Sequence, residues 1–311
     1  MIDLAVLVGP TAAGKSDLGV ELAERVGGEI VSADAFAVYR GLDIGTAKPT
    51  ADLRARVPHH LIDIADPDET YSAGMFMRDA AAAIDGIRSR GRLPIVVGGT
   101  LFYVRSLLHG LFPEPPKSPA VRRYLLSLWQ QRPAEVVRWL ELLDPDSAAR
   151  IAPGDQQRVL RALEVTVAAG RPMTELWGAA GPARRRYDAL VMGIALPRGI
   201  LHARIKQRVE AIFAAGLLDE VRGLLGAGVP ADAHALKAIG YRECRDVVRG
   251  TMTLDEARER TTIATRQLAK RQISWLRGEA GTEWLQGADE MALTQAISHL
   301  EARCGSGTGP A

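Results

Sequence analysis

The sequence predicts an α/β fold in which helices flank a mostly parallel sheet, and three observations support this prediction. Short apolar runs of strand length alternate with segments of helical periodicity towards both ends of the chain, which is typical of parallel strands joined by helical crossovers. The first apolar run leads directly into a glycine-rich loop that opens a helix. The middle of the chain shows only helical patterns and lies between two strands, which predicts an inserted all-helical lobe.

The glycine-rich loop follows the first predicted strand, 4–8, and fits the phosphate-binding pattern G-x-x-x-x-G-K-[ST]. Glycines let successive backbone N–H groups converge on a phosphate, and the N-terminus of the next helix adds partial positive charge. That helix has apolar residues at four-residue spacing and ends at a Gly-Gly pair. The core is therefore predicted to be of the P-loop type. Its predicted phosphate-binding residues are Gly9, Pro10, Thr11, Ala12, Ala13, Gly14, Lys15 and Ser16, and the hydroxyl of Ser16 is the predicted ligand of a Mg²⁺ ion.

The second predicted strand, 29–34, ends in the carboxylate of Asp34. Ligands of open α/β sheets bind beyond the carboxyl ends of the strands, so Asp34 is expected to face the glycine-rich loop. A turn or a helix cap is the alternative role for an aspartate at this place. The next segment, 35–49, is predicted to be a long functional loop.

Two further strands are predicted at 61–64 and 93–97, with a helix capped by Ser72 between them. The strand at 93–97 closes with Gly98-Gly99-Thr100. A nucleotide hydrolase usually carries an Asp for magnesium at the end of the corresponding strand. Glycines here permit a ligand to approach closely, and Thr100 offers one hydroxyl. ATP hydrolysis is therefore disfavoured.

A proline-rich break, 112–119, precedes the all-helical stretch from about 120 to 177. Its sharpest helix, 155–165, is expected to bury Val159, Leu160 and Leu163. The predicted organisation is an α/β catalytic core at 1–112 and 187–304, a helical insertion at 113–186 and a disordered tail at 305–311.

The second half of the core begins with a strand at 189–196. Beyond it, Arg204 and Arg208 share one helix face, where they either bracket an anion or are solvated charges balanced by Glu210. A long helix is predicted at 254–277. Its basic face comprises Arg266, Lys270 and Arg277, and the opposing apolar stripe of Ala264, Leu268 and Trp275 is interpreted as core. A final strand is predicted to begin at Trp284.

The bulk composition is that of a soluble globular chain: 311 residues, 47% apolar, 24% charged and a net charge of +2. No apolar run approaches the roughly 18 residues of a membrane span, and the first apolar run is too short for a signal peptide. Cys244 and Cys304 share no metal or redox spacing. The sequence therefore predicts a cytoplasmic protein without a membrane segment, and the lack of an exposed heptad seam favours a monomer.

Seven segments together, in this order and over 4–277, resemble the tRNA dimethylallyltransferase (tRNA isopentenyltransferase) family. They are Gly9–Ser16, Ser32–Asp34, Tyr39–Pro49, Val97–Thr100, Asp155–Glu164, Ile239–Tyr241 and Ala264–Gln272. The resemblance implies transfer of a dimethylallyl group from dimethylallyl diphosphate to the exocyclic amine of the adenosine 3′ of the anticodon in tRNA. It also implies that the glycine-rich loop, with Mg²⁺, holds the diphosphate leaving group.

The roles of individual residues follow from the same resemblance. Asp34 matches the general base, and Thr100 matches a hydroxyl that positions the amine or the bridging oxygen. Arg208, with Arg204 beside it, looks like a second diphosphate clamp. The helical insertion is expected to grip the anticodon arm. The residues expected to bind tRNA are Asp34, Ala35, Phe36, Ala37, Thr100, Arg122, Gln157, Arg158, Val159, Leu160, Arg161, Arg266, Lys270 and Arg271.

The chain departs from the family directly after the aspartate, where Ala35 and Ala37 replace a usual Ser and a frequent Gln. Side-chain hydrogen bonds to substrate from those two positions are not carried over. Two alternatives share parts of this pattern. An adenylate isopentenyltransferase uses the same donor, but a mononucleotide acceptor needs no helical lobe. A small-molecule kinase shares the opening loop, but the strand-end acid and an arginine-rich lid are missing.

Overall fold

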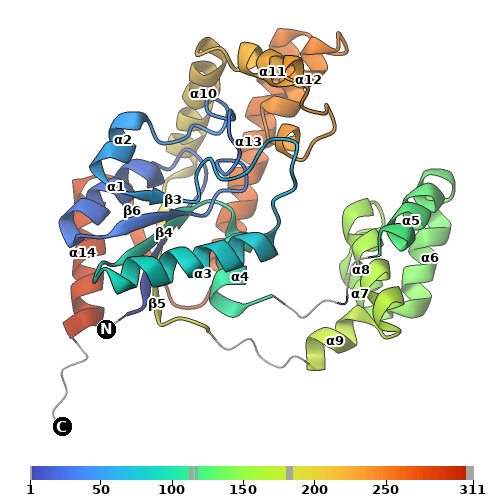
Figure 1. The fold of residues 1–311 in the computed structure, drawn as a ribbon, viewed down its shortest axis with the longest axis horizontal. Helices are drawn as coiled ribbons and strands as arrows, with labels where there is room; N and C mark the ends of the chain where they lie inside the picture. The colour runs from blue at the N-terminus through green and yellow to red at the C-terminus, as the bar shows by residue number, and fades with distance from the viewer. Residues whose placement is uncertain (1, 112–114, 116–117, 180–184, 306–311) are drawn as a thin grey trace. The chain divides into compact units, whose positions relative to one another are not determined.

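The structure is a computed structural model that describes residues 2–111, 115, 118–179 and 185–305 (Figure 1). The chain divides into two compact units. The first combines Met1–His109 with Arg185–Ala311, and the second comprises Gly110–Arg184. The second unit begins and ends slightly earlier than the predicted insertion at 113–186. Of the predicted tail, Gly305 belongs to the last helix and 306–311 lie outside the described residues.

The first unit is built on a six-stranded sheet in which every paired strand is parallel, in the order β3-β2-β4-β1-β5-β6. The strands are β1 (Leu4–Val8), β2 (Glu29–Ser32), β3 (His59–His60), β4 (Pro94–Gly98), β5 (Ala189–Ala195) and β6 (Thr282–Gln286). The strand predicted at 61–64 is wrong, because Leu61 and Asp63 have φ of 64° and 56° and end the edge strand at His60. The final strand begins two residues before Trp284.

Helices cover both faces of this sheet. Successive side chains of a strand point to opposite faces, and because both sets are apolar here, each face is buried under a layer of helices. In β1, Leu4, Val6 and Val8 pack towards one layer, and Ala5 and Leu7 pack towards the other. The first layer includes α3 (Ala73–Ser89), α4 (Leu101–His109), α10 (Arg198–Ala214), α11 (Leu217–Gly226), α12 (Tyr241–Val248) and α13 (Leu254–Arg277). The second includes α1 (Lys15–Val26) and α14 (Glu290–Gly305), and the remaining elements of this unit are α2 (Ala51–Arg56) and the 3₁₀ turn η1 (Ala235–Lys237).

The second unit has an apolar core of its own. It consists of α5 (Pro119–Gln131), α6 (Pro133–Leu143), α7 (Pro145–Arg150), α8 (Gln156–Ala169) and α9 (Met173–Ala179). Three of these helices begin on a proline, which suits the first turn because its missing N–H would be unpaired there. Buried Leu140, Leu160 and Leu163 lie in this core. Within the described part of the chain, no helix is long and apolar enough to span a membrane.

The register of the strands brings three loop starts to one edge of the sheet. Val8 pairs with both Gly98 and Gly193, and Ser32 pairs with Val97. The residues that follow β1, β2 and β4 therefore emerge side by side. β1 lies between β4 and β5, whereas the next strand along the chain, β2, lies on the far side of β4. The strand order therefore reverses at β1, and the glycine-rich loop follows this strand. Ligands of such sheets usually bind at this point.

Gly98 lets β2 and β4 approach closely at this edge. A Cβ at Gly98 would lie 2.2 Å from the carbonyl oxygen of Ala33. That oxygen accepts a hydrogen bond from the backbone N–H of Thr100 at 3.1 Å, so it is fixed. Glycine at the strand end was expected to permit the close approach of a ligand, and in the structure Gly98 permits the close approach of the neighbouring chain at Ala33.

We expect Gly98→Ala to lower the free energy of unfolding by about 2–3 kcal/mol, because the added methyl group must push two paired strands apart. Gly86→Ala in α3 is the matched control, since a Cβ there meets only the Arg90 guanidinium at 3.6 Å. Replacing a helical glycine in open space is neutral or stabilises by up to about 1 kcal/mol. Thermal unfolding of both variants checks this, and equal midpoints would contradict the close-approach argument.

Candidate active site

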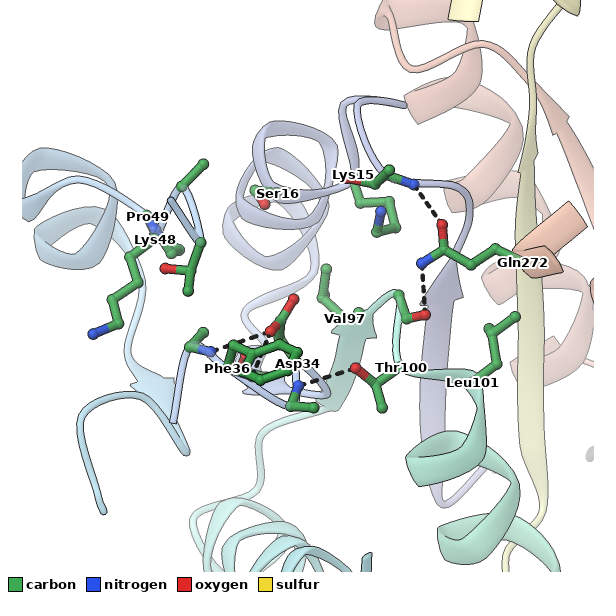
Figure 2. A pocket seen from close by; sticks show the side chains of 18 of the residues that line it. Lys15, Ser16, Asp34, Phe36, Lys48, Pro49, Val97, Thr100, Leu101 and Gln272 are labelled. Carbon is green, nitrogen blue, oxygen red and sulfur yellow. Dashed lines mark hydrogen bonds between the residues drawn. The ribbon is translucent and has the colours of Figure 1, made fainter. Parts of the chain in front are cut away.

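A cavity of about 510 Å³ opens at this edge of the sheet, and Figure 2 shows the side chains that line it. Residues from separate segments of the chain meet there, among them the glycine-rich loop, the ends of β2 and β4, the loop at 46–49, α10 and α13. The structure brings the two predicted catalytic residues, Asp34 and Thr100, together with four of the predicted diphosphate ligands, Thr11, Lys15, Ser16 and Arg208. The other predicted ligands, Gly9, Pro10, Ala12, Ala13 and Gly14, are not among the residues that line the cavity.

The glycine-rich loop has the backbone of an anion-binding turn. Gly14 has φ of 90° and Ala12, although not a glycine, has φ of 64°, so the chain curls before α1 begins at Lys15. Ala13 is buried and closes the turn through its N–H, which donates to the carbonyl of Pro10 at 3.2 Å. Ala13 therefore contributes to the turn through its backbone.

Lys15 is held inside the site. Its ammonium donates to the carbonyl oxygen of Pro10 at 2.8 Å. Burial, and then the positive charge of Arg208, lower the pKa of Lys15 to about 8, while the nearby charge of Asp34 opposes the shift. Two cations next to one carboxylate leave a net positive site, which favours an anionic ligand.

Asp34 has both of the roles that the sequence left open. Its Oδ1 accepts hydrogen bonds from the backbone N–H groups of Phe36 at 2.9 Å and Ala37 at 3.1 Å, which closes a turn. Among the described residues no hydrogen bond reaches Oδ2, and the side chain lines the cavity (Figure 2). One oxygen therefore fixes the orientation of the carboxylate, and the other is available to a ligand.

Thr100 is tied to the same turn. Its Oγ1 accepts a hydrogen bond from the backbone N–H of Ala35 at 3.0 Å (Figure 2). The hydroxyl proton of Thr100 is then directed away from that N–H and can be donated within the cavity. Ala35, Phe36 and Ala37 hold Asp34 and Thr100 through their backbones, so the loss of the family's polar side chains at 35 and 37 leaves this framework intact.

Arg208 projects from α10 and donates to the carbonyl oxygen of Thr46 at 3.1 Å. Burial lowers its pKa from the usual value, and the charge of Asp34 opposes that effect. Arg204, one turn earlier, is exposed and reaches the carbonyl oxygen of Ala13 at 3.4 Å. Of the two arginines, only Arg208 lines the cavity.

Gln272 in α13 joins two sides of the cavity. Its Oε1 accepts from the backbone N–H of Thr11 at 2.8 Å, and its Nε2 donates to the carbonyl oxygen of Gly99 at 2.8 Å (Figure 2). The sequence alone assigned Gln272 no role. Its position on the helix could have indicated one, because Gln272 shares one face of α13 with Leu268 and Trp275.

The interpretation of Ala264, Leu268 and Trp275 as core is confirmed in part: Ala264 is buried and Trp275 packs against the core. Leu268 and Trp275 also line the cavity, which the sequence did not indicate. The basic residues of α13 also separate. Arg271 lines the cavity at Asp34, whereas Arg266 and Lys270 line a second cavity of about 1140 Å³ on the other side of the helix. Residues spaced by four on a helix share a face, and Arg271 follows Lys270 directly, so one helix cannot present all three to a single cavity.

The second cavity is basic. Its charged and titratable lining residues within the described chain are Arg198, His202, Arg266, Lys270 and Arg277. The Nε atom of Arg266 is buried there without a hydrogen-bond partner among the described residues. The predicted common face of Arg266, Lys270 and Arg277 is confirmed by this shared cavity.

The predicted RNA-contacting turn lies in α8 of the helical unit. Gln157 and Arg158 are exposed, but Val159 and Leu160 are buried in the core of that unit. The predicted burial of Val159, Leu160 and Leu163 is confirmed, because an amphipathic helix buries one face, and any contact of 159 and 160 with tRNA stays a prediction. Elsewhere in the unit, Arg122 and Arg161 pair with Glu164 at 3.0 Å and 3.3 Å.

Comparison with known proteins places this geometry in one family. The model of the IPP transferase family matches residues 37–279, and that of the Isopentenyl transferase family matches residues 2–59. The tRNA dimethylallyltransferase 2 of Geotalea uraniireducens is 46% identical over 292 residues, covering 94% of each chain. The tRNA dimethylallyltransferase of Anaeromyxobacter dehalogenans is 49% identical over 284 residues, covering 91% of this chain and 92% of the relative.

Two solved structures share the fold. The tRNA isopentenylpyrophosphate transferase of Bacillus halodurans is 35% identical with a TM-score of 0.71, covering 97% of this chain and 95% of that one. A eukaryotic dimethylallyltransferase acting on tRNA is 27% identical with a TM-score of 0.77, covering 96% of this chain and 77% of that one. From sequence, fold and site together, the chain belongs to the tRNA dimethylallyltransferase family.

Proposed function

We propose that the protein transfers a dimethylallyl group from dimethylallyl diphosphate to the N6 amine of the adenosine 3′ of the anticodon in tRNA, releasing diphosphate. The observation that carries this proposal is a carboxylate with one oxygen available, Asp34, in the same cavity as the glycine-rich loop and two partly buried cations, Lys15 and Arg208. The absence of an acid from Gly98-Gly99-Thr100 argues against nucleotide hydrolysis.

The glycine-rich loop binds the diphosphate. Its backbone N–H groups and the N-terminus of α1 face the anion, and Lys15 exchanges the carbonyl of Pro10 for a phosphate oxygen. Arg208 approaches from α10 and neutralises charge that develops as the ester bond breaks. Leu268, Trp275 and Leu101 supply apolar surface for the five-carbon group.

Asp34 and Thr100 serve the acceptor. The exocyclic amine of adenine is a weak nucleophile because its lone pair is delocalised into the ring. As the new C–N bond forms, the C–O bond of the donor breaks and its electron pair leaves with the diphosphate. Oδ2 of Asp34 takes the amine proton, and the hydroxyl of Thr100 holds the acceptor or the bridging oxygen in line.

Mg²⁺ fits this site through oxygen ligands. Ser16 is exposed at the start of α1 and lines the cavity, and no cluster of three His, Cys, Asp or Glu among the described residues competes for a metal. Ser16 with oxygens of the diphosphate would hold the ion, as hard cations prefer. When bound, it would offset charge on the leaving group.

The tRNA is proposed to bind through its anticodon arm. Gln157, Arg158, Arg161 and Arg122 are the contacts proposed in the helical unit, where Val159 and Leu160 contribute packing. The basic cavity at Arg266 and Lys270 suits phosphates of the RNA backbone. The target adenosine must leave the loop to reach Asp34. A monomer acting in the cytoplasm, where mature tRNA is modified, fits these features.

One experiment distinguishes the proposed activity from two alternatives, an adenylate isopentenyltransferase and a small-molecule kinase. Purified protein is incubated with labelled dimethylallyl diphosphate or labelled ATP, each with bulk tRNA and separately with AMP. We expect label in tRNA from the prenyl donor alone, with N6-dimethylallyladenosine found by mass spectrometry of the nucleosides. Efficient labelling of AMP without tRNA, or transfer from ATP, would overturn the proposal.

We expect Asp34→Asn to lower the rate of transfer at saturating substrates by at least about 10²-fold, because the amide cannot take the amine proton. The asparagine oxygen still accepts from Phe36 and Ala37, so the turn is preserved. Affinity for tRNA, measured by filter binding, should match wild type. Near-normal single-turnover transfer by this variant would remove Asp34 from the role of base.

We expect affinity for dimethylallyl diphosphate to fall as the pH rises through about 8. Lys15, whose pKa burial lowers to about 8, then loses the proton that makes it a cation in the free protein. Below that pH it is charged and binds the anion. The measurement is kcat/KM for the donor between pH 6.5 and 9.5. Lys15→Arg is the control, because arginine keeps its charge, so its profile should show only the titration of the donor and the other groups.

A further inference from the structure

The loop that follows Tyr39 is anchored by a carboxylate on α11 that the mechanism above does not use. Glu220 accepts hydrogen bonds through Oε2 from the backbone N–H groups of Asp43 at 3.1 Å and Ile44 at 2.9 Å. Its Oε1 accepts the hydroxyl proton of Tyr241. That hydroxyl in turn accepts from the backbone N–H of Gly45 at 3.1 Å. Three successive N–H groups of one loop thus converge on a single carboxylate–phenol pair.

The pair is rigid because the phenol is fully buried. The side chain of Tyr241 is 0% exposed, and a Cβ at Gly45 would lie 2.3 Å from its ring, so the loop backbone rests directly on the aromatic face. Burial, and then the hydrogen bond to Glu220, raise the pKa of Tyr241 far above its usual value. The phenol therefore stays protonated. It donates its proton to Glu220 and accepts from the N–H of Gly45, so the direction of each hydrogen bond is fixed.

The anchored segment leads directly to the active site. The next carbonyl after Gly45 is that of Thr46, which accepts the hydrogen bond of Arg208 at 3.1 Å. Thr46 and Arg208 both line the cavity at Asp34. An arginine placed to clamp a leaving group loses effectiveness when its guanidinium moves by about 1 Å. The contact with Thr46 limits that movement only if the loop itself is fixed.

We infer that Glu220 and Tyr241 are positioning residues for the diphosphate clamp, acting on Arg208 through the backbone of 43–46. Neither residue is among those that line the cavity at Asp34. The pair sets the place of the Thr46 carbonyl and, through it, the orientation of the guanidinium. The role assigned to Arg208 rests on the proposed function, but its orientation towards an anion can be measured without any transfer.

The test is a double-mutant cycle in which calorimetry measures the affinity of each variant for inorganic diphosphate. Tyr241→Phe keeps the ring and removes the hydroxyl that links Gly45 to Glu220. We expect diphosphate affinity to fall about tenfold in the wild-type background, the usual scale for hydrogen bonds to charged groups, and by less than about twofold when Arg208 is already alanine. In the transfer assay the KM for the donor rises while the affinity for tRNA is unchanged.

A fall of the same size in both backgrounds overturns the inference, because the effect would then not pass through Arg208. Unchanged diphosphate binding in Tyr241→Phe overturns it as well. If that variant does not fold, the pair Glu220→Gln and Glu220→Ala replaces it. The glutamine retains an acceptor for the loop and should bind diphosphate better than the alanine. Asp219→Asn is the matched control beside it on α11, since its side chain is 77% exposed and pairs only with Arg222 among the described residues.

A protein that binds diphosphate as expected but transfers no prenyl group would contradict the proposed function alone. Loss of the coupling between Tyr241 and Arg208 in an active enzyme would contradict the positioning role alone. The two ideas therefore fail separately.

Discussion

The active site depends on one amide side chain that holds two loops at a fixed separation. Gln272 accepts from the N–H of Thr11 and donates to the carbonyl of Gly99, so it joins the glycine-rich loop to the end of β4. Both bonds are 2.8 Å long and use an amide that is 6% exposed. Val8 and Gly98 are the last paired residues of β1 and β4, so this amide links the two loops beyond the end of the sheet. The carbonyl of Gly99 also accepts from the N–H of Leu101 at 3.1 Å, which fixes it within its own loop.

The charged side chains that line the cavity carry an excess of positive charge. Lys15 and Arg208 both have lowered pKa values because they are buried, and Asp34 alone opposes those shifts. Two cations beside one carboxylate leave the site net positive, which favours an anion such as the diphosphate of the proposed donor. Binding of such an anion would offset the repulsion between the two like charges.

Much of this architecture could be predicted from local patterns. The glycine-rich loop, Asp34, Thr100 and the helix Leu254–Arg277 are signalled by motif, strand end or period, and each lies where it was expected. Pair contacts across the fold could not be predicted. Gln272 resembles any polar residue on a helix, and the separation of Arg266 from Arg271 depends on which faces of α13 its neighbours leave open. The burial of Val159 and Leu160 follows from the period of their helix, whereas their expected contact with tRNA depends on a partner that the sequence does not contain.

The spacing of β2 and β4 also limits what this scaffold can become. An aspartate introduced at 98, the strand end where hydrolases bind magnesium, would place its Cβ 2.2 Å from a backbone oxygen that cannot retreat. At 99 the same atom would lie 2.6 Å from the amide nitrogen of Gln272. An acid at either position would first have to displace this oxygen or this amide, so the close approach of β2 and β4 disfavours a carboxylate at the strand end. The same packing that shapes the cavity therefore also restricts which side chains the end of β4 can carry.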